Sequence, residues 1–323
     1  MQHYLITGGA GFIGSNLIRT LLHRKEDILI SCIDNLDPFY PAAIKERNMV
    51  SFRHDPRFRF YHADLGGTSS SQLAEMISEP VDAIIHLAAR AGVRPSIIDP
   101  AGYQRANILG LQHLLDFAKE KNIRQFVFAS TSSVYGVNTN LPWSEDEKLL
   151  PISPYAMTKL SGEMLGHVYA HLYDIRFIAL RFFTVYGPGQ RPDLAIHKFT
   201  RAMLRDEEIT MYGDGSTSRD YTYVADTVEG IIAAIDYNRS NYEVINLGNN
   251  YSVRLSDLVA QLSMITGKQA RIRWMEEQPG DVPATYARID KAKSLLGYQP
   301  QTELEEGLRK FYTWYTENQD VLV

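Results

Sequence analysis

Short apolar segments alternate with helical patterns along residues 1–183. The helical patterns include 106–121 and 155–173, and each lies between two apolar segments. Segments that are apolar on both faces are typical of parallel strands in a sheet that helices cover on both sides. We therefore predict an α/β fold built on a doubly wound parallel sheet. The predicted strands are HYLIT (3–7), ILISCID (28–34), RFRFYHADL (57–65), VDAIIHLAA (81–89), QFVFAST (125–131) and IRFIALRFF (175–183).

The pattern becomes less regular beyond about residue 195. Helical and strand-like segments are mixed there, and they include AIHKFTRAML (195–204), ITMYG (209–213), EVINLGN (243–249) and SDLVAQLSMITG (256–267). This change predicts a second, smaller lobe of mixed α/β structure. We place the first domain at 1–190 and the second lobe mainly at 191–323, with later segments crossing back to the first domain.

Composition argues against several classes of protein. The formal net charge of −5 and the pI near 6.0 argue against a nucleic-acid binder, which usually carries a basic patch. No apolar run reaches membrane-spanning length, and the first residues read as a strand rather than a signal peptide. The single cysteine, Cys32, lies in an apolar run and fits a reducing compartment as a core residue. We therefore expect a cytoplasmic protein without nucleic-acid or membrane partners.

Three glycines, Gly8, Gly11 and Gly14, form a GxxGxxG turn between the first predicted strand and a helical pattern. Without Cβ atoms, the backbone can approach a pyrophosphate, and a helix N-terminus attracts its charge. Asp34 ends the next strand, 20 positions after Gly14, where a carboxylate binds an adenosine ribose and repels a 2′-phosphate. No arginine follows Asp34 directly. The pattern predicts a Rossmann-type fold that binds NAD rather than NADP.

Tyr155 and Lys159 are separated by four positions and share one face of a predicted helix. The strand 125–131 runs into four hydroxyl residues at 130–133, where a parallel strand delivers its end to a ligand crevice. An ammonium and an oxidised nicotinamide ring nearby would lower the pKa of the tyrosine phenol. These groups can remove a proton from an alcohol while its carbon gives a hydride to NAD⁺.

Together these motifs resemble the extended short-chain dehydrogenase/reductase superfamily, in its nucleotide-sugar epimerase and dehydratase branch. The matching segments span nearly the whole chain and are TGGAGFIG, the HLAA strand, STSSVYG, YxxxK and RDYTYVAD. The resemblance implies a tightly held NAD and a UDP- or dTDP-sugar between two lobes. It implies that Tyr155 is the catalytic base, that Lys159 assists it and binds the NAD ribose, and that Thr131, with Ser132 beside it, is the hydroxyl partner. The implied cofactor contacts are Gly8, Gly11, Phe12, Ile13, Gly14, Asp34, Asn35, Asp64, Leu65, Ala88, Ala89, Asn107, Tyr155 and Lys159.

The residue before the VYG signature separates the reactions of this branch. Related dehydratases and UDP-glucuronate decarboxylases carry an acidic residue shortly before VYG, whereas this chain has Ser133 there. Elimination between C5 and C6 of the sugar needs an acid or base near C6, and serine is a poor one. The pattern favours epimerisation, in which C4 is oxidised, the 4-keto sugar turns over and the hydride returns to the other face.

The segment RFFTVYGPGQRPDLAIHKF (181–199) resembles the UDP-glucuronate 4-epimerases. Arg191 lies in the part that should approach the substituent on C5, and a guanidinium binds a carboxylate in a planar, bidentate way. Oxidising C4 of a uronic acid creates a β-keto acid, which readily loses CO₂, so holding the carboxylate would protect the intermediate. The implied sugar and UDP contacts are Arg94, Ser96, Ser133, Thr184, Arg191, Ala195, Phe199, Met211, Tyr212, Arg219 and Arg288.

Three alternatives stay open from the sequence. The first is a 4-epimerase of neutral UDP-sugars such as UDP-glucose or UDP-N-acetylglucosamine, and the second is a UDP-glucuronate decarboxylase. The third is a non-catalytic, NAD-sensing Rossmann protein, which the presence of both Tyr155 and Lys159 disfavours. No cluster has the spacing of a metal site, and Arg181 reads as a structural residue. The resemblance also implies a homodimer formed through the helices at 101–121 and 155–173.

Overall fold

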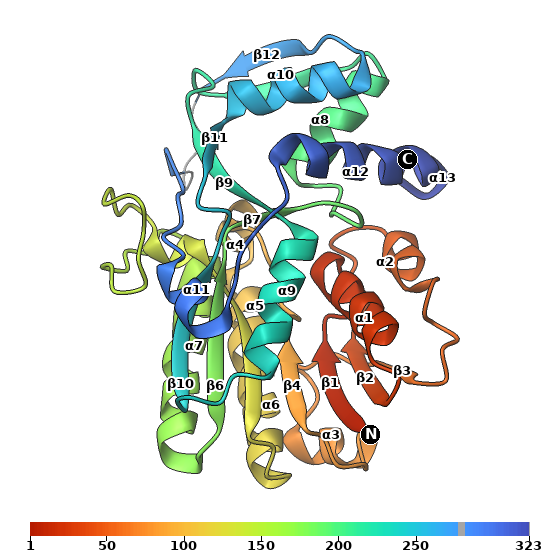
Figure 1. Cartoon of the computed structure of the whole chain (residues 1–323), viewed down its shortest axis with the longest axis vertical. Helices are drawn as coiled ribbons and strands as arrows, with labels where there is room; N and C mark the ends of the chain where they lie inside the picture. Colours follow the sequence, from red (N-terminus) through yellow and green to blue (C-terminus); the bar gives the residue numbers. More distant parts are fainter. Residues whose placement is uncertain (277–281, 323) are drawn as a thin grey trace.

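The computed structural model describes residues 1–276 and 282–322, and its largest element is a seven-stranded parallel sheet (Figure 1). The strand order is β10-β6-β5-β4-β1-β2-β3, and every neighbouring pair is parallel. This is the doubly wound arrangement that the sequence predicts. The strands are β1 (Gln2–Thr7), β2 (Ile28–Asp34), β3 (Phe58–His62), β4 (Ala83–His86), β5 (Gln125–Thr131), β6 (Arg176–Phe182) and β10 (Tyr242–Leu247).

Helices cover both faces of this sheet because neighbouring strand residues point to opposite sides. Leu5, Ile84 and Phe126 pack on the face with α3 (Ser70–Met76), α6 (Gly110–Glu120) and α7 (Pro154–Tyr173). Ile6, Ile85 and Val127, one position further along each strand, pack on the face with α1 (Phe12–Arg24) and α9 (Val224–Ile235). Each strand therefore contributes to two apolar cores, which explains why its sequence is apolar almost throughout.

The predicted helix at 106–121 is the last part of a longer helical segment. This segment consists of α5 (Pro100–Gln104), a π-helical turn at Arg105–Leu109 and α6, in direct succession. A short helix, α4 (Val93–Ile98), precedes it, and α2 (Ala42–Met49) follows β2. A 3₁₀ turn at Ser132–Tyr135 directly follows β5.

The second lobe lies beyond the carboxyl ends of the main strands (Figure 1). It contains the sheet β11-β9-β7 and the two-stranded sheet β12-β8. Their bounds are β7 (Thr184–Tyr186), β8 (Glu208–Tyr212), β9 (Ser218–Tyr223), β11 (Ser252–Arg254) and β12 (Arg271–Met275). The helices of this lobe are α8 (Ala195–Leu204), α10 (Leu255–Thr266), α12 (Leu304–Glu317) and α13 (Gln319–Leu322). The helix α11 (Asp290–Leu296) instead packs beside β10 and α9 of the main sheet (Figure 1).

One predicted element belongs to a different part of the molecule. The sequence groups 243–249 with the second lobe, whereas β10 is the edge strand of the main sheet and pairs with β6. Its residues Ile245 and Leu247 are buried beside α9, which also returns to the main sheet. Across the described residues, no helix combines the length and apolarity that crossing a membrane requires.

Candidate active site

The glycine turn joins β1 to α1 at the carboxyl edge of the sheet. Gly8 has a φ of +73°, and a Cβ there would lie 2.6 Å from the Ala88 nitrogen. A Cβ on Gly14 would lie 2.3 Å from the Gly8 oxygen, whereas a Cβ on Gly11 would lie 3.1 Å from the same atom. Gly8 and Gly14 are thus required by the packing of the turn. Gly11 instead leaves room at the start of α1, whose first N–H groups can bind an anion.

Asp34 connects the glycine turn to the end of β2. Its Oδ2 accepts a hydrogen bond of 3.1 Å from the Ala10 N–H, and its Oδ1 accepts one of 2.9 Å from the Leu36 N–H. These bonds fix the carboxylate at the edge of the cavity described next. Each oxygen keeps a further acceptor position, which a ribose hydroxyl can use.

A cavity of about 450 Å³ extends along the strand ends from the glycine turn to α7. The predicted cofactor residues that line it are Gly8, Gly11, Phe12, Ile13, Gly14, Asp34, Asn35, Asp64, Leu65, Ala88, Ala89, Tyr155 and Lys159. Asn107 lies outside this lining. Its amide accepts a hydrogen bond from the Arg90 N–H and donates to the Arg90 carbonyl and to Thr158 Oγ1. Asn107 therefore holds the loop after β4 against α7.

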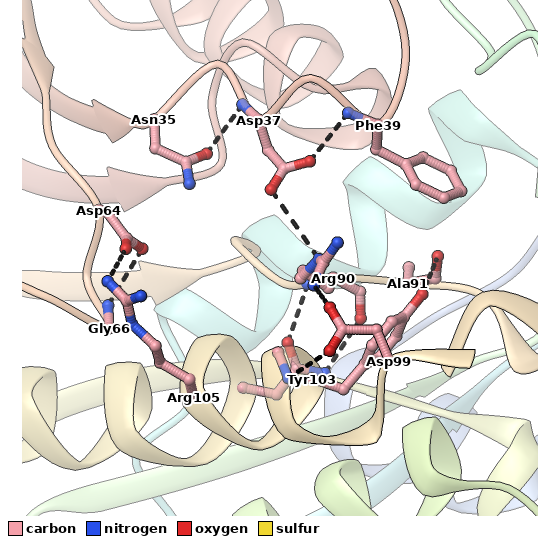
Figure 2. A network of polar contacts seen from close by, with 12 residues as sticks. Asn35, Asp37, Phe39, Asp64, Gly66, Arg90, Ala91, Asp99, Tyr103 and Arg105 are labelled. Carbon is pink, nitrogen blue, oxygen red and sulfur yellow. Dashed lines mark hydrogen bonds and ion pairs between the residues drawn. The ribbon is translucent and has the colours of Figure 1, made fainter. Parts of the chain in front are cut away.

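Figure 2 shows a polar network beside this cavity, centred on Arg90. Arg90 Nη1 donates a hydrogen bond of 2.5 Å to Asp99 Oδ2, and Arg90 Nε lies 3.9 Å from Asp37 Oδ2. Asp37 follows β2 and Arg90 follows β4, and these two strands flank β1 in the sheet. The ion pair therefore connects two loops on either side of the glycine turn.

The catalytic candidates come from β5 and α7. Ser153 caps α7, since its Oγ accepts a hydrogen bond of 3.2 Å from the Ala156 N–H, and Pro154 occupies the first position of the helix. This start places Tyr155 in the first turn and Lys159 one turn later on the same face. Thr131, Ser132 and Ser133, at the end of β5 and just beyond it, line the same cavity.

Tyr155 and Lys159 have different partners. Lys159 Nζ donates a hydrogen bond of 2.7 Å to the Ala129 carbonyl, and burial lowers the pKa of Lys159 to about 7. Burial also raises the pKa of Tyr155, while a hydrogen bond with Thr131 and the charge of Arg191 act in the opposite direction. Thr131 and Arg191 thus partly offset the effect of burial on the pKa of Tyr155, and the assistance expected from Lys159 stays a prediction.

A buried ion pair between Arg181 and Glu163 supports the site, and the sequence analysis did not predict Glu163. Arg181 Nε and Nη2 donate hydrogen bonds of 3.0 and 2.8 Å to Glu163, and both side chains are 3% exposed. Ser130 Oγ also donates to Glu163, and Arg181 Nη1 donates to the Tyr135 hydroxyl. Arg181 is thus a structural residue, as predicted. The signal for Glu163 is its spacing, since it lies four positions after Lys159.

A second cavity of about 730 Å³ is lined mainly by residues of the second lobe, together with Arg94 of α4. Thr184 and Leu194 line both cavities, so the two meet there. Four basic side chains face the second cavity, and two of them, Lys198 and Arg201 on α8, were not predicted. The predicted substrate residues in its lining are Arg94, Thr184, Ala195, Phe199, Tyr212 and Arg219.

Three predicted substrate residues lie outside the lining of both cavities. Ser96 is buried and donates a hydrogen bond of 2.6 Å to the Val93 carbonyl, and Met211 is 1% exposed within the core. Arg288 is exposed on the strand-like segment whose backbone pairs with Trp143. Ser96 and Met211 therefore belong to the packed protein interior rather than to the surface of either cavity.

Arg191 lines the first cavity and already has a carboxylate partner. Its Nε and Nη2 donate hydrogen bonds of 2.9 and 2.7 Å to the two oxygens of Asp193. The guanidinium also lies 5.3 Å from the centre of the Phe39 ring. Asp193 was not predicted, although it follows Arg191 by two positions.

The fold and the site define the class of protein. A doubly wound sheet, a phosphate-binding glycine turn and a Tyr-Lys pair on one helix are the features of a short-chain dehydrogenase/reductase. The chain belongs to the family whose model is described as GDP-mannose 4,6 dehydratase, which matches residues 5–311 and comprises NAD-dependent epimerases and dehydratases.

Several known proteins are similar over almost the whole chain. An uncharacterised protein of Methanocaldococcus jannaschii is 41% identical over 100% of this chain and 98% of its own length. The UDP-glucuronate 4-epimerase of Thermodesulfobacterium geofontis is 37% identical over the same shares of both chains. The crystal structure of UDP-glucuronic acid 4-epimerase from Bacillus cereus, in complex with UDP-glucuronic acid and NAD, has a TM-score of 0.92 and 39% identity, covering 98% of this chain and 99% of that one.

Proposed function

We propose that this protein is an NAD-dependent epimerase that interconverts UDP-glucuronate and UDP-galacturonate at C4. One observation carries the choice of substrate. Arg191 lines the same cavity as Tyr155 and Ser133, and its charge is close enough to lower the pKa of Tyr155. A sugar whose C4 hydroxyl meets Tyr155 would therefore bring its C5 substituent towards a guanidinium. The similarity to UDP-glucuronate 4-epimerases supports the same choice.

The first cavity fits NAD. The open backbone at Gly11 and the start of α1 suit the pyrophosphate, Asp34 suits the adenosine ribose, and Lys159 lies where it can reach the second ribose. When bound, NAD supplies the acceptor and later the donor of the C4 hydride, and its oxidised ring carries a positive charge.

Tyr155 is the group that moves the proton. Its phenolate accepts the proton of the C4 hydroxyl, and the phenol formed in this way returns a proton to the C4 oxygen after the sugar has turned. Thr131 shares a hydrogen bond with this phenol, and it can stabilise the phenolate if its one O–H proton turns from Ser133 to the tyrosine oxygen. Ser133, which accepts a hydrogen bond from Thr131, offers no group with a pKa suited to elimination at C5 and C6. Epimerisation therefore fits these residues better than dehydration.

The carboxylate of the substrate must survive oxidation at C4. Loss of CO₂ from a β-keto acid turns the carboxylate into a neutral molecule, so bonds to the carboxylate stabilise the acid more than the departing CO₂. Arg191 can supply two such bonds, and Ser133 and Thr184 lie on the same cavity wall. These contacts oppose decarboxylation.

The second cavity suits the UDP part of the substrate. Arg94, Lys198, Arg201 and Arg219 line it and can attract a diphosphate in a chain with a net charge of −5. Phe199, Tyr212 and Ala195 supply apolar surface for uracil. Because the cavities meet at Thr184, one ligand can extend from the uridine site to Tyr155.

A second candidate is a 4-epimerase of neutral UDP-sugars. The ion pair of Arg191 with Asp193 favours it, since a guanidinium that is already neutralised attracts a further carboxylate less strongly. Proton NMR of the protein with NAD and either UDP-glucuronate or UDP-glucose distinguishes the two. We expect UDP-glucuronate to give UDP-galacturonate at a stable ratio, without net NADH, and Tyr155→Phe to abolish this conversion.

Two other NMR results would count against the proposal. Conversion of UDP-glucose alone would assign the protein to neutral sugars. A UDP-pentose as the main product would indicate a decarboxylase.

We further propose a cytoplasmic homodimer. Met164, Val168 and Leu172 repeat every four positions on α7 and are 65, 45 and 59% exposed. A second copy of the chain can cover this apolar stripe. Sedimentation velocity should give a dimer for the wild type and a monomer for Met164→Glu combined with Val168→Glu, and a wild-type monomer would contradict the dimer.

A further inference from the structure

The Arg191–Asp193 pair lies where the two cavities meet. Both residues belong to the loop between β7 and α8, and their side chains are 18 and 33% exposed. Arg191 lines the cavity that contains Tyr155, whereas Asp193 lines the one assigned to UDP. The pair therefore borders the position at which a sugar must lie to reach Tyr155.

The surroundings of Arg191 disfavour an unpaired guanidinium. The ring of Phe39 lies against it, and the phenols of Tyr40 and Tyr155 are close enough to interact with its charge. Few water molecules can reach a charge with so little exposed surface, so losing its partner would be costly. The guanidinium needs a carboxylate whether or not a substrate is present.

During epimerisation, Arg191 would lose its carboxylate partner for part of every turnover. The 4-keto sugar must turn over between the two hydride transfers, and its C5 carboxylate must move with it. Any contact that Arg191 makes with that carboxylate is broken and formed again in every turnover. A second carboxylate within reach lowers the cost of the intermediate state, because one ion pair replaces another.

We propose that Asp193 is an exchangeable stand-in for the substrate carboxylate. It holds Arg191 in the free enzyme and while the keto sugar turns, and it releases Arg191 to the C5 carboxylate of the bound uronate. This inference rests on the proposed function. It also gives a basis for specificity, since the hydroxymethyl group of a neutral sugar cannot displace a carboxylate from a bidentate ion pair.

The test uses the NAD-loaded enzyme as the wild type, Asp193→Asn, Asp193→Ala and the control Asp206→Asn. Asp206 follows α8, and its side chain is 74% exposed, so the control changes the same charge outside the site. We measure the Kd of UDP-glucuronate and UDP-glucose by calorimetry and kcat for both uronates by NMR. Added acetate serves as a small replacement carboxylate.

If the two carboxylates exchange on Arg191, Asp193→Asn should tighten UDP-glucuronate binding several-fold relative to UDP-glucose, because the Asp193 carboxylate no longer competes for Arg191. It also predicts that kcat falls by about tenfold, because the turning sugar leaves Arg191 unpaired. Acetate should restore part of kcat in Asp193→Ala and leave the wild type and Asp206→Asn unchanged.

If the Asp193 variants bound UDP-glucuronate and UDP-glucose more weakly by the same factor, Asp193 would be a fixed structural residue of the loop and the inference would be overturned. An unchanged kcat in both Asp193 variants would overturn it as well. Failure of the wild type to convert UDP-glucuronate would instead refute the proposed function, and the inference with it.

Discussion

Lys159 Nζ lies 2.7 Å from the carbonyl oxygen of Ala129 and 4.8 Å from the centre of the Phe128 ring. The side chain thus crosses from α7 to the end of β5 and is only 2% exposed. One hydrogen bond to a neutral carbonyl does not offset the loss of water around an ammonium, so burial lowers the pKa of Lys159 to about 7.

This pKa has a consequence for stability. Between about pH 7 and pH 10.5 the unfolded chain binds a proton on Lys159 that the folded chain does not, so stability rises with pH across that window. The expected slope is about 1 kcal/mol per pH unit. Urea unfolding at several pH values between about pH 7.5 and pH 9.5 gives the free energy of unfolding of the NAD-free wild type and of Lys159→Met. If this free energy changed with pH in the same way in both proteins, the prediction would be contradicted.

Gly11→Ala and Gly14→Ala should have different effects although both alter the same turn. A Cβ at Gly14 meets backbone atoms at 2.3 Å, so Gly14→Ala should destabilise the fold by about 3 kcal/mol or more. A Cβ at Gly11 has its nearest neighbour at 3.1 Å, so Gly11→Ala should fold and lose NAD affinity. Thermal unfolding and NAD titration check this pair, and tight NAD binding by Gly11→Ala would count against the assigned pyrophosphate site.

Arg191→Ala should lower kcat/KM for UDP-glucuronate by about 100-fold, because it removes a charged, bidentate contact. The fraction of product that appears as UDP-pentose should rise, since the keto acid is then less protected. Rates and products are followed by NMR. Arg124→Ala is the control, because that side chain is 71% exposed and pairs with Asp174 outside both cavities.

Arg90→Gln should accelerate NAD dissociation by about tenfold, because the contact with Asp37 that connects the loops after β2 and β4 is lost. Exchange of bound NAD against labelled NAD gives the rate. Arg59→Gln is a suitable control, because Arg59 lies on the outer strand β3 and its side chain pairs with Glu79. Equal rates in the wild type and Arg90→Gln would show that the ion pair does not retain the cofactor.

Much of the cofactor site is readable in the sequence because its signals are local. The glycine turn follows directly on β1, and Asp34 ends the next strand. Tyr155 and Lys159 share a helix face through their four-residue spacing. A parallel sheet then brings all strand ends to one edge, so the residues after several strands meet without further information.

The substrate site was harder to predict, because its residues are positioned by packing between segments that are distant in the sequence. The resemblance implied substrate contacts for Ser96 and Met211, yet both side chains are buried outside the lining of the two cavities. Lys198 and Arg201 were missed because nothing in α8 alone indicates which face meets a cavity. The strand β10 was grouped with the wrong lobe because its pairing with β6 joins segments some 65 positions apart.

The sequence by itself therefore determined the doubly wound sheet, the dinucleotide turn and the Tyr-Lys pair, since each follows from short-range spacing and strand polarity. Only the tertiary structure decided that Lys159 contacts Ala129, that Glu163 is bound by Arg181 and that Arg191 is paired with Asp193. The direction of each of these side chains depends on which charges and carbonyls the folded chain brings within reach. Spacing along the chain does not record that proximity.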